Sequence, residues 1–295
     1  MKVMANGLSI EVDVQGPPHG EPLLLVMGLG MQLVAWPQEL VELLVGQGYR
    51  VVRFDHRDVG LSQWLDELGV PNLAWAGMRH ALGLAVHSPY GLPDMAADAL
   101  GLMDGLGLER AHVCGASMGG MIGQHLASGH PSRVKSLVLV MTTSGSRRLP
   151  QPGLRARKAM MSRPRSAAPE DVVEHVQRLM TVIGSPGHPT DPAVLAQRTR
   201  EAAARAWHPA GTARHVAAVI ADGDRSALLP RIQAPTHVVH GLADPLVPPA
   251  AAEQLAACIP GATLDLVPGM GHDLPSALLP RLAEGIGRNA RRARG

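Results

Sequence analysis

A single serine stands in a turn motif that is typical of nucleophilic enzymes. Ser117 has Gly115 two positions before it and Gly119 two positions after it, which is the spacing G-x-S-x-G. An apolar run over residues 111–114 precedes the motif, and a helix-forming stretch over residues 118–128 follows it. The pattern predicts a sharp strand-to-helix turn, in which the small neighbours let the serine hydroxyl project from the end of a sheet.

A serine hydroxyl becomes a good nucleophile when a base takes its proton and a carboxylate orients that base. Two loops late in the sequence offer these groups: Asp244 follows the apolar run 236–239, and His272 follows the run 263–267. The order serine, acid, histidine is the one that accompanies a G-x-S-x-G turn. Because loops at the carboxyl ends of parallel strands open on one edge of a sheet, we expect Ser117, Asp244 and His272 to meet there.

Other titratable residues have simpler interpretations. Most of the 14 histidines fall in predicted strands, turns or helices, and only His272 lies in a glycine-rich loop after the last strand. Asp273 is adjacent to His272 and is expected to point elsewhere. Asp265 lies within a strand, and Asp222 precedes the strand that leads to Asp244. Asp244 is therefore the predicted acid.

Ester hydrolysis also needs hydrogen-bond donors for the developing oxyanion, and backbone amides aimed at that oxygen supply them. The N–H of Met118 is one candidate, because it lies at the start of the predicted helix, where the dipole favours negative charge. The second donor is expected from the loop 27–31 that follows the apolar run 23–26, with Leu29 as the candidate. Leu29 and Met118 are thus the predicted oxyanion hole.

Apolar runs alternate with helical patterns along most of the chain. The candidate strands are residues 23–26, 49–54, 111–114, 134–140, 236–239 and 263–267. Apolar residues at helical spacing over 92–106 predict a helix between two of them. This alternation predicts βαβ units and therefore an α/β fold with a mostly parallel sheet.

The alternation stops between residues 144 and 229. Helical stretches such as 171–183 occur there without a convincing strand. We expect a core domain of residues 1–143 and 230–295, and a helical cap of residues 144–229 that covers the sheet edge. The alternative is a peripheral bundle with no role at the site. The shorter excursion 64–90 can form part of the same roof.

These residues make the chain resemble α/β-hydrolase fold serine esterases over nearly its whole length. The turn over 55–62, with Asp55, Arg57, Gly60 and Ser62, is similar to the D-x-R-x-x-G-x-S turn of that family. The stretches 24–28 and 269–272 resemble those of bacterial hydrolases of the aclacinomycin methylesterase type. The resemblance implies a mostly parallel eight-stranded sheet flanked by helices, with the cap inserted after the sixth strand.

One position departs from the pattern of the family. Many relatives have histidine before the oxyanion glycine, whereas this chain has Met27 before Gly28. We expect the change to alter loop packing rather than chemistry.

The sequence thus predicts a serine carboxylesterase that hydrolyses apolar esters of short to medium length through an acyl-enzyme. Alternatives on the same triad are a lactonase, a polyketide methylesterase, a thioesterase, a perhydrolase and a carbon–carbon bond hydrolase; a non-catalytic ligand receptor is an alternative of another class. The residues expected to line the pocket are Gly28, Met31, Gln32, Trp36, Met160, Met161, Leu179, Met180 and Ile183. Such side chains suit an apolar acyl or alcohol group, and they can equally form the core of the cap.

Composition excludes several other classes of protein. The formal net charge of +2 gives no reason to expect a nucleic acid partner. No spacing of Cys or His suggests a metal site, and residues 115–120 lack the ending of a phosphate-binding loop, so no cofactor is expected. The expected partner is a small-molecule ester, bound by a monomer or a homodimer.

Cysteine usage and hydropathy bear on location. Cys114 and Cys258 are simplest to interpret as reduced thiols of a cytoplasmic protein. The first residues lack the apolar core of a secretory signal, and the longest apolar stretch, 23–31, is too short for a membrane span. The basic residues of 288–295 are expected to form a solvated tail.

Overall fold

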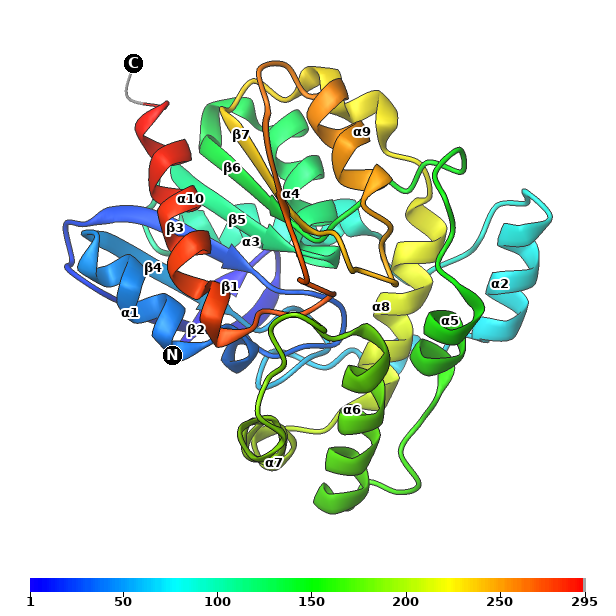
Figure 1. Ribbon diagram of the computed structural model, residues 1–295. Coiled ribbons are helices and arrows are strands. Elements are labelled where there is room, and N and C mark those ends of the chain that lie inside the picture. The colour runs from blue at the N-terminus through cyan, green and yellow to red at the C-terminus, as the bar shows by residue number, and fades with distance from the viewer. Residues whose placement is uncertain (294–295) are drawn as a thin grey trace.

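The computed structural model describes residues 1–293, which build one sheet with helices on both of its faces (Figure 1). The strands are β1 (Lys2–Ala5), β2 (Leu8–Gln15), β3 (Glu21–Val26), β4 (Tyr49–Phe54), β5 (Ala111–Ala116), β6 (Val134–Val140), β7 (Thr236–Gly241) and β8 (Thr263–Val267). The helices are α1 (Gln38–Gly46), α2 (Leu73–Ala81), α3 (Leu92–Gly105), α4 (Met118–Gly129), α5 (Leu154–Met161), α6 (Pro169–Ile183), α7 (Pro192–Arg205), α8 (Pro209–Asp222), α9 (Ala250–Cys258) and α10 (Leu279–Arg291).

The sheet has eight strands in the order β1-β2-β4-β3-β5-β6-β7-β8. The β1–β2 and β2–β4 pairs are antiparallel, and every other neighbouring pair is parallel. The prediction of a mostly parallel eight-stranded sheet is therefore confirmed. Because β5, β7 and β8 run in the same direction, the loops that follow them open at one edge of the sheet.

Strand β3 shows why the apolar runs are continuous rather than alternating. Leu24 and Val26 belong to the hydrophobic cluster that also contains residues of α3 and α4, whereas Leu23 and Leu25 belong to the cluster shared with α1 and α10. None of these four side chains has exposed area. A parallel strand covered by helices on both faces needs an apolar residue at every position, which is what this run provides.

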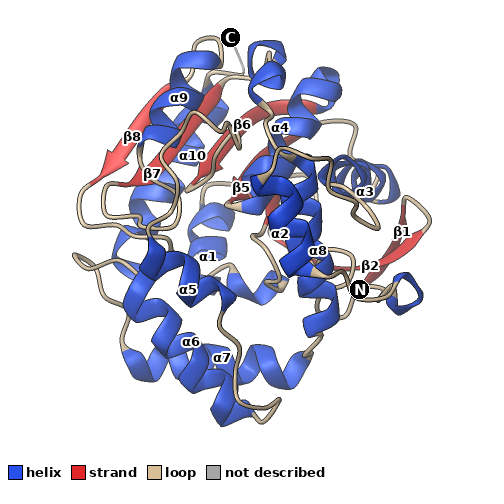
Figure 2. Ribbon diagram, turned by 90° about the vertical axis from the view of Figure 1, so that its right-hand side faces the viewer, coloured by secondary structure: helices blue, strands red, loops and turns tan. Residues whose placement is uncertain are grey.

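Four helices, α5 to α8, lie between β6 and β7, as the resemblance implied for a cap after the sixth strand. Figure 2 shows α5, α6 and α7 gathered on one side of the sheet. Helix α8 packs against α2, so the excursion 64–90 joins this layer. We call residues 144–229 the cap.

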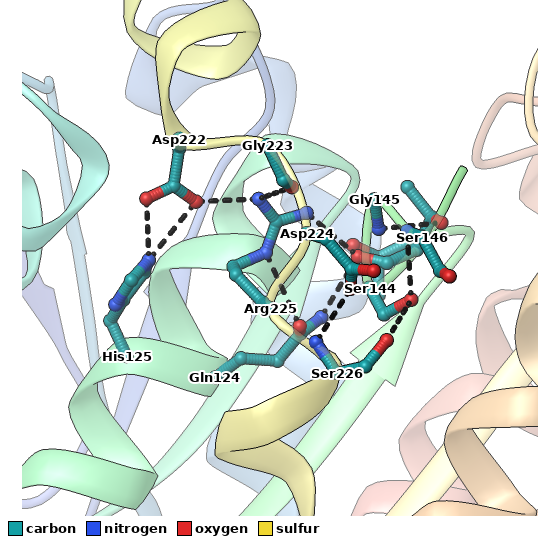
Figure 3. Close-up of polar contacts among 12 residues, drawn as sticks. Gln124, His125, Ser144, Gly145, Ser146, Asp222, Gly223, Asp224, Arg225 and Ser226 are labelled. Carbon is teal, nitrogen blue, oxygen red and sulfur yellow. Dashed lines mark hydrogen bonds and ion pairs between the residues drawn. The ribbon is translucent and has the colours of Figure 1, made fainter. Parts of the chain in front are cut away.

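The cap leaves and rejoins the core at one place, which is drawn in Figure 3. A Cβ on Gly145, where the chain leaves, would overlap the carbonyl oxygen of Gly223, where it returns. The buried Arg225 donates hydrogen bonds from its guanidinium to Asp222 at 2.5 Å and to the Thr143 carbonyl at 3.1 Å. The two connections are thus joined to one another at the root of the cap.

The structure corrects the expectation that the basic end of the chain is a solvated tail. Residues 288–291 belong to α10, and the buried Asn289 donates hydrogen bonds to the carbonyls of Leu137 and Pro235, both at 2.9 Å. Arg292 donates to the Gly261 carbonyl at 2.6 Å. The prediction of a solvated tail is therefore wrong for 288–292, because one face of the helix is apolar and packs on the sheet; residues 294–295 lie outside the described residues.

Residues 1–293 contain no candidate for a transmembrane helix. None of the helices there is both long enough and apolar enough to cross a bilayer.

Candidate active site

Ser117 occupies a strained turn between β5 and α4. Its backbone has φ 53° and ψ −119°, in the region of positive φ that residues with a side chain rarely adopt. A Cβ on Gly119 would overlap the Val26 carbonyl oxygen, and one on Gly115 would overlap the backbone of Gly119. The two glycines of the motif are therefore needed for close backbone approach, and the hydroxyl projects at the end of β5.

The structure brings the three predicted catalytic side chains together. His272 Nε2 lies 3.0 Å from Ser117 Oγ, and His272 Nδ1 lies 2.7 Å from Asp244 Oδ2. Since an ionised carboxylate only accepts, Nδ1 carries the proton and Nε2 is left to accept from the serine hydroxyl. This chain of hydrogen bonds can transfer the serine proton to the imidazole.

Backbone amides fix the carboxylate of Asp244. Its Oδ1 accepts hydrogen bonds from the N–H groups of Leu246 and Val247, both at 2.8 Å, which leaves Oδ2 for His272. The acid is buried, so its charge is held by these donors and by the imidazole rather than by water.

His240 is a further residue at the acid, and the sequence pattern did not single it out. Its Nε2 donates to the Val247 carbonyl at 2.8 Å and lies 3.5 Å from Asp244 Oδ2. Burial lowers the pKa of His240, so the ring is neutral at neutral pH. The imidazole therefore supports the loop that carries Asp244.

The loop that carries His272 is held by the cap. The Ser185 hydroxyl, just after α6, donates to the Asp273 carboxylate and accepts from the Gly271 N–H at 2.8 Å. The Ile183 carbonyl accepts from the His272 N–H at 2.7 Å. Sequence reasoning missed Ser185, because nothing in its surroundings marks a partner 86 positions away.

The two amides predicted for the oxyanion hole are both unpaired in the described hydrogen bonding. In the hydrogen bonding described for residues 1–293, the N–H groups of Met118 and Leu29 have no protein acceptor. Met118 opens α4, where the first amides of a helix lack partners within it. Gly28, next to Leu29, lies close enough that a Cβ there would be 3.4 Å from Ser117 Cβ.

The predicted pocket residues differ in how far their side chains are buried. Ile183 is buried at the His272 loop, and Leu179 and Met180 are half-buried on α6. The side chains of Met31, Met160 and Met161 are exposed.

Two of the predicted pocket residues, Gln32 and Trp36, make contacts that belong to the fold. Gln32 donates from its amide to the carbonyls of Ala202 and Ala206 at the end of α7, at 2.7 and 2.8 Å. Trp36 is fully buried in the hydrophobic cluster shared by α1 and α10. These placements favour a structural role for Gln32 and Trp36 over the lining role that the sequence suggested.

Cys114 lies just before the turn and is not a second nucleophile. It is fully buried, and burial raises the pKa of its thiol to about 12. A thiol without access to solvent or to a base stays protonated and inert.

Comparison with known proteins identifies the family of the chain. The profile of the alpha/beta hydrolase fold matches residues 21–275. Rhodomycin D methylesterase DnrP of Streptomyces peucetius is 32% identical, over 94% of this chain and 93% of that protein. A putative carbamate hydrolase, RutD of Variovorax paradoxus, is 29% identical over 90% of each chain.

A solved structure shares the fold of this chain. The enol-lactonase from Burkholderia xenovorans LB400 superposes with a TM-score of 0.73 at 25% identity, covering 99% of this chain and 100% of that one. The match extends over the whole fold, cap included, and the relatives named above share most of their length with this sequence. The chain therefore belongs to the α/β-hydrolase family, as a carboxylic ester hydrolase.

Proposed function

We propose that the protein is a serine carboxylesterase for apolar esters of short to medium length, with Ser117 as nucleophile, His272 as base and Asp244 as the orienting acid. The observation that carries the proposal is the continuous series of hydrogen bonds from Asp244 Oδ2 through the imidazole to Ser117 Oγ, at 2.7 and 3.0 Å. A serine held in this way is activated for attack on a carbonyl.

The proposed reaction has two halves. His272 Nε2 takes the hydroxyl proton as Ser117 Oγ bonds to the ester carbonyl carbon, and the carbonyl electron pair moves onto oxygen. The intermediate collapses, the alcohol leaves with the proton from His272, and an acyl-enzyme remains. His272 then takes a proton from water, which attacks the acyl carbon, and the acid leaves as Ser117 regains its proton.

The oxyanion is held by the N–H groups of Met118 and Leu29. Met118 directly follows Ser117, and Leu29 directly follows Gly28, at which a Cβ would be 3.4 Å from Ser117 Cβ. Neither amide has a protein acceptor within residues 1–293. Fixed donors of this kind stabilise the transition state because they need no reorganisation as charge develops.

We propose further that residues 1–143 and 230–295 form the catalytic core and residues 144–229 a cap that shapes the pocket. In support, the cap joins the core at one root and contacts the loops of His272 and Gln32. The position of Leu179, Met180 and Ile183 on α6, whose end adjoins His272, supports their proposed place in the pocket.

A second candidate is hydrolysis of a methyl ester on a polyketide. It is favoured by the similarity to rhodomycin D methylesterases over nearly the full chain. The similarity to an enol-lactonase makes cyclic esters a third class to test, and a receptor that binds its ligand without turnover is the alternative outside catalysis.

The test is hydrolysis of p-nitrophenyl acetate, butyrate, octanoate and laurate by the wild type and by Ser117→Ala. Ser128→Ala is the matched control, because Ser128 is a buried serine of α4, the helix that directly follows Ser117. Loss of about 10³- to 10⁶-fold in kcat for Ser117→Ala alone supports the proposal. Equal activity of Ser117→Ala and the wild type excludes Ser117 as nucleophile, and stoichiometric binding of an ester without turnover supports the receptor.

A further inference from the structure

The loop that carries the Leu29 donor is fixed at three successive peptide groups. The Met27 carbonyl accepts from His56 Nε2 at 2.8 Å, the Gly28 carbonyl accepts from the Met31 N–H at 3.3 Å, and the Gly30 N–H donates to a cap histidine at 3.3 Å. The Leu29 N–H belongs to the middle peptide group. Because the C=O and N–H of a trans peptide point in opposite directions, fixing the Gly28 carbonyl also fixes the direction of the Leu29 N–H.

The two histidines that hold this loop come from different parts of the chain. His56 belongs to the core turn after β4, and His215 belongs to α8 of the cap. Their rings meet edge to face, with centroids 5.9 Å apart, and both are buried. One imidazole bonds the carbonyl of Met27, before Leu29, and the other bonds the amide of Gly30, after it.

Hydrogen bonding determines the tautomer of each ring. His215 Nδ1 accepts from Gly30, so its proton is on Nε2, which donates to the Arg57 carbonyl at 2.9 Å. His56 donates from Nε2 to Met27. Burial lowers the pKa of His215 to about 3 and also lowers the pKa of His56, so both rings are neutral at neutral pH.

The cap reaches the same loop at a second place. Arg205 at the end of α7 donates to the Gln32 amide oxygen at 2.7 Å and to the buried Asp55 carboxylate at 2.6 Å. A Cβ on Gly30 would be 2.8 Å from the side chain of Thr212 in α8. Residues of the cap are therefore in direct contact with the oxyanion loop at Gly30 and with Gln32 just after it.

We propose that His215 and His56 are positioning residues that orient the Leu29 N–H toward the oxyanion, so that the cap is a working part of the oxyanion hole. The inference rests on the proposed function, because it needs Leu29 to be a donor in the reaction at Ser117. The inference assigns to His215, a residue of the cap, a role in the rate of the reaction. The cap then acts on catalysis as well as on substrate selection.

Paired amide substitutions test this role, because asparagine places a polar atom near the Nδ1 position of histidine and glutamine places one near Nε2. His215→Asn keeps an acceptor for Gly30 and loses the donor to Arg57, whereas His215→Gln does the reverse. At His56 the order inverts, since the essential atom is Nε2: His56→Gln keeps the bond to Met27 and His56→Asn loses it.

The expected result is a crossed pattern in kcat. His215→Gln and His56→Asn should lose about 10- to 100-fold in kcat with little change in KM, because a misplaced donor weakens the transition state more than the ground state. His215→Asn and His56→Gln should stay within a few-fold of the wild type. His237→Asn is the control and should keep full activity, because His237 is a buried histidine near the start of β7, at the opposite end of that strand from the Asp244 loop.

A trifluoromethyl ketone with an apolar chain gives a second readout. Ser117 Oγ bonds to its carbonyl carbon, the serine proton passes to His272, and the carbonyl oxygen becomes the oxyanion that Leu29 and Met118 hold. Its Ki should rise in His215→Gln and His56→Asn in proportion to the loss of kcat/KM, and Tm should not follow the same pattern.

These measurements distinguish failure of the proposed esterase function from failure of the positioning role of the two histidines. A wild type that neither hydrolyses esters nor binds the ketone overturns the proposed function and this inference with it. If the wild type does both, and the Asn and Gln variants lose equal activity in step with their Tm, then only the positioning role is overturned and the histidines are structural.

Discussion

Arg214 of α8 and Asp58 of the core form a bidentate ion pair in which both side chains are fully buried. Nε donates to Oδ2 at 2.8 Å and Nη2 donates to Oδ1 at 2.7 Å. The Tyr90 hydroxyl also donates to the carboxylate, at 2.7 Å. Burial alone would raise the pKa of Asp58, but the hydrogen bonds from Arg214 and its neighbours hold that pKa below its usual range. The pair joins cap and core through a fully desolvated contact.

Breaking this pair should destabilise the protein strongly. Asp58→Ala leaves the Arg214 guanidinium buried without its main partner, and the expected loss is about 3–5 kcal/mol in the free energy of unfolding. Urea denaturation measures the loss, and limited proteolysis should cut the cap earlier than in the wild type. Asp66→Ala is the matched control, because Asp66 is an exposed second partner of Arg214 at 3.1 Å and should cost far less. Equal stability of the two variants would contradict the role of the buried pair.

Gly119 and Gly28, which both lie near Ser117, should differ in their tolerance of a methyl group. Gly119→Ala places a Cβ onto the Val26 carbonyl, whereas Gly28→Ala places one 3.4 Å from the Ser117 Cβ, which is an ordinary contact. We expect Gly119→Ala to lower Tm sharply or prevent folding, and Gly28→Ala to fold with a Tm near that of the wild type. Thermal unfolding, monitored by circular dichroism, gives the Tm of both variants. A Gly119→Ala protein with the Tm of the wild type would refute the close backbone approach at the turn.

The orientation of His272 should depend on the charge of its acid. Asp244→Asn can present an amide N–H to Nδ1, which favours the tautomer that cannot accept the serine proton, so kcat should fall by about 10⁴-fold with KM little changed. Asp265→Asn is the control, because Asp265 of β8 forms a surface ion pair with Arg281 of α10. Steady-state kinetics on p-nitrophenyl butyrate measures both. A loss confined to KM would argue against a role in the chemical step.

Buried neutral histidines should make the fold sensitive to acid. Burial lowers the pKa of His215 to about 3, and it lowers the pKa of His56, His237 and His240 below their usual 6.5. Above about pH 6.5 neither the folded nor the unfolded state binds these protons. Below it the unfolded chain binds protons that the folded chain excludes, so stability falls as pH falls, by up to about 1.4 kcal/mol per pH unit for each histidine.

Urea midpoints at pH 7.5, 6.5, 5.5 and 4.5 should show this decline begin near pH 6.5. His237→Asn removes one of these groups and should flatten the slope by about one proton. A midpoint that stays constant down to pH 4.5 would mean that the buried rings accept protons in the folded state.

The sequence predicted the elements of the site whose positions depend on local pattern. The serine turn, the loops of Asp244 and His272, and the apolar strands all follow from short-range rules of backbone geometry and burial. Leu29 was chosen from its place in the loop after β3, and its role as a donor stays a prediction. A parallel sheet then brings these loops to one edge without further information.

The contributions of the cap could not be predicted in the same way. His215 meets Gly30 from 185 positions away, and Ser185 meets Gly271 from 86 positions away. Each partner lies in an irregular loop or on a helix whose direction depends on side-chain packing, which hydropathy patterns do not encode. Trp36 illustrates the same limit, since an indole beside a loop can face either the site or the core, and only the path of the helix that follows decides.

The meeting of Gly145 and Gly223 gives the cap the properties of an interchangeable module. Its two ends share one point on the core, so a different set of helices can be grafted there without changing the path of any strand. A graft chosen only for its pocket would nevertheless remove the acceptor for Gly30 and the hydroxyl that holds Gly271. Under the positioning role proposed for His215, an exchanged cap has to supply equivalents of His215 and Ser185, so a change of cap changes the catalytic rate together with the pocket.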